Sequence, residues 1–210
     1  MSALFHPYLC GRIAAEWLIN MKKFTAMALA LAMVLTLLAG CGKTQPEETT
    51  PAYPAPGSAL EILETVWGDY AQEEKFAIIG GNIEANIMDA PGSYDLTYAE
   101  NMTWNLLVPA DKIANVEEAA SMIHMMNANT FTCGAFKING ITAADFGAAM
   151  EQAIQNNQWM CGFPDSLLIK NFGDAYVVVA FGMTDAMTSF ETHFNAMYPG
   201  FETLYSETIG

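Results

Sequence analysis

Residues 166–181, SLLIKNFGDAYVVVAF, decide the fold that we expect for this chain. Two apolar runs, Ser166–Lys170 and Ala175–Phe181, flank the turn-forming sequence Asn-Phe-Gly-Asp at 171–174. Apolar runs of this length on either side of a glycine-containing turn predict a β-hairpin. The domain is therefore expected to contain antiparallel strands.

Segments with apolar residues at helical spacing alternate with short apolar runs along the rest of the chain. The predicted helices are 58–71, which the capping box of Ser58 and Glu61 begins, 115–126, capped at Asn115, 141–154 and 185–198. The further predicted strands are 76–79, 104–108, 130–138 and 201–205. Helices packed on antiparallel strands make an α+β fold.

The two halves of the domain share one predicted order of elements. Each half is expected to run helix, strand, strand, helix, strand, and residues 106–126 can be laid over 179–199 by position, though not by identity. This correspondence suggests a duplicated α-β-β-α-β unit.

A lipoprotein signal lies N-terminal to the domain, in residues 21–41, MKKFTAMALALAMVLTLLAGC. Two lysines precede an apolar run, and small residues precede Cys41, as in secretory signals. The run is shorter than the roughly 20 residues that span a membrane. We therefore expect cleavage before Cys41 and a diacylglyceryl group on its thiol. An ordinary secreted protein and an uncleaved anchor are the alternatives.

Domain boundaries follow from this signal. Residues 1–20 precede a second methionine and are interpreted as a gene-model extension, and 21–40 form the signal peptide. Residues 41–57 contain four prolines and are expected to be an extended linker on the lipid anchor. Residues 58–210 would form the α+β domain.

The charge balance of the chain is strongly acidic. Its 23 Asp and Glu residues outnumber its 8 Lys and Arg residues. Nucleic acid binding requires basic residues that neutralise phosphates, so nucleic acid is excluded as a partner. The plainest interpretation is a solvated acidic surface, and loose capture of cations or basic peptides is the other.

Two cysteines, Cys133 and Cys161, remain in the domain outside the leader and the lipidation site. In an oxidising compartment such a pair is a possible disulfide, worth about 3 kcal/mol. Two free thiols are the equal alternative. Cys161 could also be a nucleophile if His124 or His193 lay beside it, and a buried hinge is the other interpretation of its surroundings, residues 158–164.

Met122, His124 and Met126 form a candidate metal site. Thioether and imidazole ligands suit Cu(I), which an exported lipoprotein could capture. On a helix, however, Met122 and Met126 share the apolar face, where methionine fills core gaps. Core packing is therefore the competing interpretation, and no cofactor is predicted.

The lipobox and the segments ALEILETVW, EKFAIIGG, MIHMMNANTF, NQWMCGFPDSLLI and YVVVAFG together resemble a family of uncharacterised clostridial lipoproteins, some labelled bacteriocin transport accessory protein. The resemblance spans Met21 to the C-terminus. It implies a surface-anchored protein of Gram-positive bacteria and supplies no catalytic residues. The chain has no CxxC motif, so thioredoxin-type exchange has no support.

These observations favour a non-enzymatic lipoprotein on the outer face of the cytoplasmic membrane. Its expected partner is a peptide, another protein or an envelope component, and a role beside a bacteriocin or peptide exporter is one version. The alternatives are a lipoprotein that captures a small ligand or metal through Met122, His124 and Met126, and a thiol-dependent enzyme.

Overall fold

The structure is a computed structural model that describes residues 53–210. The predicted signal peptide, Cys41 and most of the linker lie outside these residues. Within them, one eight-stranded antiparallel sheet has the order β2-β1-β4-β5-β7-β6-β8, with β3 beside β4. The strands are β1 (Ile78–Gly80), β2 (Ile87–Met88), β3 (Gly92–Ser93), β4 (Val116–His124), β5 (Phe131–Ile138), β6 (Ser166–Phe172), β7 (Tyr176–Gly182) and β8 (Glu202–Thr208). The helices are α2 (Ala59–Asp69), α3 (Asn101–Asn105), α4 (Ala143–Gln155) and α5 (Thr184–Met197).

The predicted hairpin is confirmed as β6 and β7. Leu168 pairs with Ala180, and Phe172 pairs with Tyr176 at the turn, where Gly173 has a positive φ of 53°. Every residue of β7 is buried. A strand that is buried on both faces requires a layer of helices on each side of the sheet.

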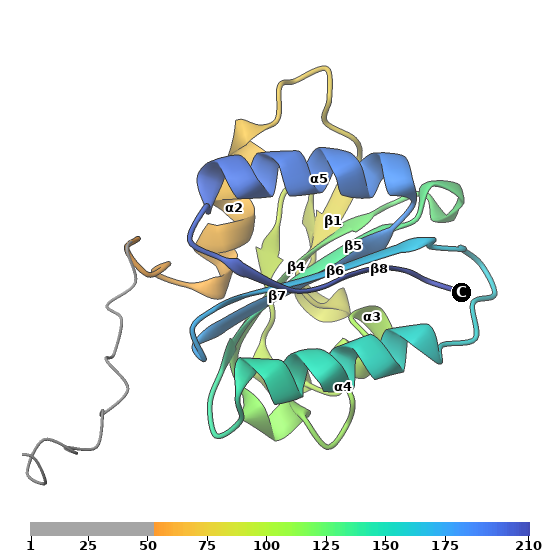
Figure 1. Cartoon of the computed structure of the whole chain (residues 1–210). Coiled ribbons are helices and arrows are strands. Elements are labelled where there is room, and N and C mark those ends of the chain that lie inside the picture. Colours follow the sequence, from red (N-terminus) through yellow and green to blue (C-terminus); the bar gives the residue numbers. More distant parts are fainter. Residues whose placement is uncertain (1–52) are drawn as a thin grey trace, which may run out of the picture. The chain divides into compact units, whose positions relative to one another are not determined.

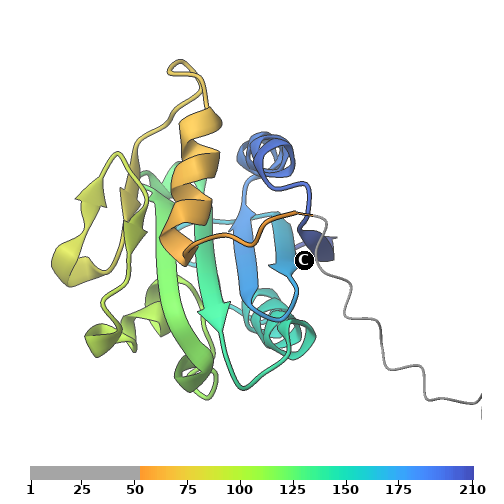
Figure 2. The same ribbon diagram turned by 90° about the vertical axis from the view of Figure 1, so that its left-hand side faces the viewer.

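Figures 1 and 2 show these two layers, with α2 and α5 over one face of the sheet and α4 over the other. The side chains of alternate strand residues point to opposite layers. In β7, Val178 and Ala180 pack toward α2 and α5, and Val177 and Val179 pack toward α4. The predicted α+β fold is therefore confirmed.

Two predicted elements are wrong. Residues 116–124 form β4, a central strand, and not the helix predicted from Asn115 to Met126. Residues 104–108 do not form a strand, because α3 occupies Asn101–Asn105. The duplication is not confirmed, since laying 106–126 over 179–199 would place the strand β4 on the helix α5.

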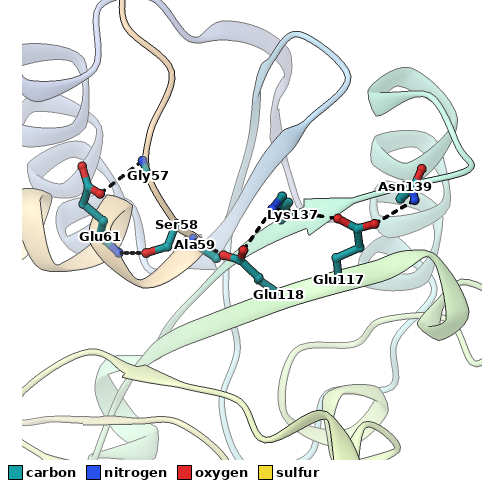
Figure 3. Close-up of polar contacts among 8 residues, drawn as sticks. All are labelled: Gly57, Ser58, Ala59, Glu61, Glu117, Glu118, Lys137 and Asn139. Carbon is teal, nitrogen blue, oxygen red and sulfur yellow. Dashed lines mark hydrogen bonds and ion pairs between the residues drawn. The ribbon is translucent and has the colours of Figure 1, made fainter.

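The start of α2 is fixed to one end of the sheet (Figure 3). The Ser58 side chain caps the helix by accepting a hydrogen bond from the Glu61 backbone N–H at 3.0 Å, as predicted. The Ala59 backbone N–H donates to Glu118 Oε2 at 3.2 Å, and Lys137 Nζ lies 3.1 Å from Glu118 Oε1. A carboxylate at a helix N-terminus is favourable, so Glu118 of β4 ties α2 to the sheet.

Candidate functional site

A hollow of about 560 Å³ opens at the opposite end of the sheet from the start of α2. It lies where α3, the end of β4, the start of β5 and the loop after α4 meet. In Figure 1 the β4–β5 turn and the loop after α4 lie toward the end of the domain that carries the C-terminus. Its lining is Thr103, Trp104, Asn105, Leu107, Ile123, His124, Met126, Asn127, Thr130, Phe131, Thr132, Asn157, Gln158, Trp159, Met160, Cys161, Gly162 and Phe181.

Large apolar side chains stand exposed around this hollow. Trp104 is 80% exposed, Met160 85% and Met126 58%. Single exposed apolar residues are ordinary, but a cluster around a concavity is typical of a binding site. We call Trp104, Met126 and Met160 the rim of the hollow.

The floor of the hollow is part of the folded core. Phe131 and Phe181, which are 1% and 4% exposed, come from adjacent strands β5 and β7. Trp159 packs on Phe181 with ring centroids 5.5 Å apart. Strands held in register position the floor, so the hollow does not need a ligand to form.

Leu107, beside Trp104, has a positive φ of 57°. This left-handed conformation costs roughly 1–2 kcal/mol for a residue with a Cβ, and such strain is often found at functional sites. Leu107 follows Leu106, the C-cap of α3, so it sets the direction in which the chain leaves the helix that carries Trp104.

The lining contains no Asp, Glu, Lys or Arg. Its titratable residues are His124 and Cys161. The His124 ring stacks on Phe76, with centroids 4.8 Å apart, and its Nδ1 accepts a hydrogen bond from the Met126 backbone N–H at 2.9 Å. Burial lowers the pKa of His124, which favours the neutral ring. The hollow is thus an uncharged site in an acidic protein.

The structure does not bring the three predicted metal ligands together. Met122 is completely buried in the core beneath α2 and α5, whereas Met126 is exposed on the rim. Only His124 and Met126 reach the hollow. Among residues 53–210 there is no group of three or more His, Cys, Asp or Glu side chains that could hold a metal ion. Core packing, the competing interpretation, holds for Met122, although residues 116–124 form the strand β4 and not the helix on which that interpretation was based.

The two cysteines are free thiols, so the structure has the second of the two alternatives and not the possible disulfide. Cys133 of β5 is buried beneath α2 and α5, whereas Cys161 is exposed and lines the hollow. In the described residues no hydrogen bond joins Cys161 to an imidazole. His193, the other proposed base, instead lies 2.8 Å from Asp69 and stacks on Tyr70.

The buried groups near Cys133 predict a loss of stability at alkaline pH. Burial raises the pKa of the Cys133 thiol well above its ordinary value of 9.0 and that of Tyr70 to about 12. Above pH 9 the unfolded chain therefore releases protons that the folded chain retains, and the free energy of unfolding should fall as pH rises. Urea unfolding at pH 7 to 10.5 measures this slope. Cys133→Ala should flatten it, and an equal slope in that variant would contradict the assignment.

Of the rim residues, the sequence analysis named Met126, as a candidate metal ligand, and missed Trp104 and Met160. Trp104 was placed in a strand, and residues 158–164 were interpreted as a buried hinge, although Met160 and Phe163 are 85% and 72% exposed. The concentration of large apolar residues in that segment was the available signal.

Comparisons give this chain no relatives: no family model, no curated protein and no solved structure matches it. Within residues 53–210, no helix is long and apolar enough to cross a membrane.

Proposed function

We propose that this chain is a non-enzymatic binding protein, held on the outer face of the cytoplasmic membrane by a lipid on Cys41, that captures an apolar segment of a peptide or protein in the hollow. The observation that carries the proposal is the rim of Trp104, Met126 and Met160 around an uncharged concavity. The anchor is inferred from residues 21–41, and a role beside a peptide exporter remains one version of the function.

The rim provides enough apolar surface for useful affinity. A tryptophan side chain offers 150–250 Å² of contact surface, so burying Trp104 against a ligand is worth about 3–5 kcal/mol before the costs of association. Methionine is flexible and polarisable, so Met126 and Met160 can adapt to ligands of different shape. The combination suits capture of varied apolar groups.

The chemistry of the lining also supports binding rather than catalysis. A covalent mechanism would need a nucleophile bonded to a base that a third group orients. In the part of the chain that the structure describes, Cys161 has no such base, and His124 Nδ1 is already bonded to backbone. The carboxamides and threonines of the lining are hydrogen-bonding groups without acid–base function at neutral pH.

Trp104→Ala should weaken capture of the partner by about 30-fold or more, the loss expected of a central aromatic contact. The measurement is quantitative affinity capture from the native membrane, followed by a titration of each protein recovered. Met197→Ala is the matched control, because Met197 is also exposed, at 38%, but lies outside the hollow. Both variants should fold normally. Equal capture by Trp104→Ala and the parent chain would contradict the proposal.

A further inference from the structure

We infer that the hollow receives a basic, amphipathic polypeptide segment, whose apolar side chain enters the uncharged hollow while its cationic residues are attracted by the net negative charge of the domain. This inference rests on the proposed function and adds the class of partner. Two independent features support it, the distribution of charge and the free hydrogen-bonding groups of the lining, and the position of the described linker residues leaves the hollow uncovered.

The hollow and the rest of the domain differ in charge. The lining is neutral, but the chain as a whole has a net charge of −15. The four described lysines offset this only in part: Lys112 pairs with Asp111, Lys137 pairs with Glu118, Lys170 is buried at 4% exposure, and Lys75 lies over the Trp67 ring. A ligand with an apolar centre and basic flanks therefore fits both regions.

The lining offers unused groups that match a peptide backbone. The side-chain amides of Asn127, Asn157 and Gln158 line the hollow, and none of them makes a hydrogen bond with another described residue. A carboxamide presents both a donor and an acceptor, as each peptide unit does. An acyl chain could use neither, so these amides favour a peptide over a lipid tail.

The linker joins the domain at the end of the sheet opposite the hollow. Pro56 is buried there, and the Tyr53 ring lies so close to Gly200 that a Cβ at that position would be 2.6 Å from it. Glu118 of β4 lies at this same end, because it accepts a hydrogen bond from the Ala59 backbone N–H. Ile123, about 17 Å further along β4, lines the hollow. The described part of the linker therefore leaves the hollow uncovered.

Anionic lipid is further disfavoured by electrostatics. The negative potential of an acidic domain repels phosphate head groups and attracts cations. The sign of the charge thus favours a dissolved basic peptide over the membrane surface as the occupant.

The test is titration of the full chain, held in zwitterionic nanodiscs, with a short tryptophan-free peptide of leucine and lysine at amphipathic spacing. Tryptophan emission and calorimetry report binding. We expect an emission shift to the blue, and binding about tenfold or more weaker for the matched peptide with glutamate in place of lysine. Trp104→Ala should weaken binding about tenfold, Met197→Ala should not, and added salt should reduce but not abolish it.

The outcomes separate this inference from the proposed function. Equal binding of the lysine peptide and its glutamate analogue, with both dependent on Trp104, would overturn the basic-partner inference and leave the apolar capture site intact. Binding of phosphatidylglycerol vesicles with the same dependence on Trp104 would overturn it in favour of lipid. If the lysine peptide binds but Trp104→Ala has no effect, the contact lies outside the hollow and the inference fails.

Discussion

Gly92→Ala is expected to lower the free energy of unfolding by about 3 kcal/mol or more and to detach β1 and β3 from the edge of β4. A Cβ at Gly92 would lie 2.6 Å from both the Gly80 carbonyl carbon and the Gly81 nitrogen. Both neighbours are backbone atoms, so no rotamer change can relieve the clash. β3 and β1 pair with neighbouring segments of β4, at Ser121 and Ile123, and would have to move apart.

Urea unfolding measures the loss, and hydrogen exchange of residues 78–94 locates it. Gly68→Ala is the matched control, because a Cβ at Gly68 meets nothing within 4 Å and the residue lies exposed in α2. That substitution should stabilise the protein by about 0.5–1 kcal/mol, since alanine has the higher helix propensity. Similar effects of the two substitutions would show that the close approach of Gly80 and Gly92 does not constrain the fold.

This glycine contact also explains the Gly80-Gly81 pair. Gly81 has a φ of 82°, and its N–H donates to the buried Ser121 Oγ at 3.1 Å. The pair therefore serves a turn that packs backbone against backbone.

The elements that were predicted correctly are those whose structure follows from the pattern of their own residues. The hairpin at 166–181, the helices at 141–154 and 185–198 and the capping box at Ser58 all follow from local apolar spacing and turn chemistry, and the structure contains each of them. They were predictable because each presents a continuous apolar face, or a cap, within its own residues.

β4 was mistaken for a helix for a physical reason. A central strand covered by helices on both faces is apolar on both sides and loses the alternation that identifies a strand. In β4 the residues Val116, Ala119, Ala120 and Ile123 also happen to follow helical spacing, and alanine has high helix propensity. Only pairing with β5, a contact between distant residues, favours the strand.

The rim could not be predicted from the sequence, because its members come from separate segments. Trp104 lies in a helix of five residues, Met126 lies in a turn and Met160 in a loop, so no periodic pattern joins them. Their exposure is a property of the folded chain alone. The floor was easier to predict, since Phe131 and Phe181 lie in strands that were predicted.

Phe131→Ala is expected to destabilise the protein by about 3–5 kcal/mol, the usual cost of emptying a fully buried phenylalanine site. The Phe131 side chain is 1% exposed, and its ring packs 5.4 Å from that of Phe190 and 5.6 Å from that of Phe76. It therefore joins α5 to the sheet while forming part of the floor of the hollow. Urea unfolding measures the loss, and Phe163→Ala, at a residue that is 72% exposed, should change stability by less than about 0.5 kcal/mol.

The conservative variant Phe131→Leu separates the two roles of this side chain. Leucine restores most of the buried volume, so this variant should recover most of the stability. It should also retain capture, because the rim that contacts the partner is unchanged. If Phe131→Leu folds stably but loses capture as completely as Trp104→Ala, then the ligand reaches past the rim and contacts the floor directly. A loss below about 1 kcal/mol for Phe131→Ala would contradict the packing of α5 on the sheet through this ring.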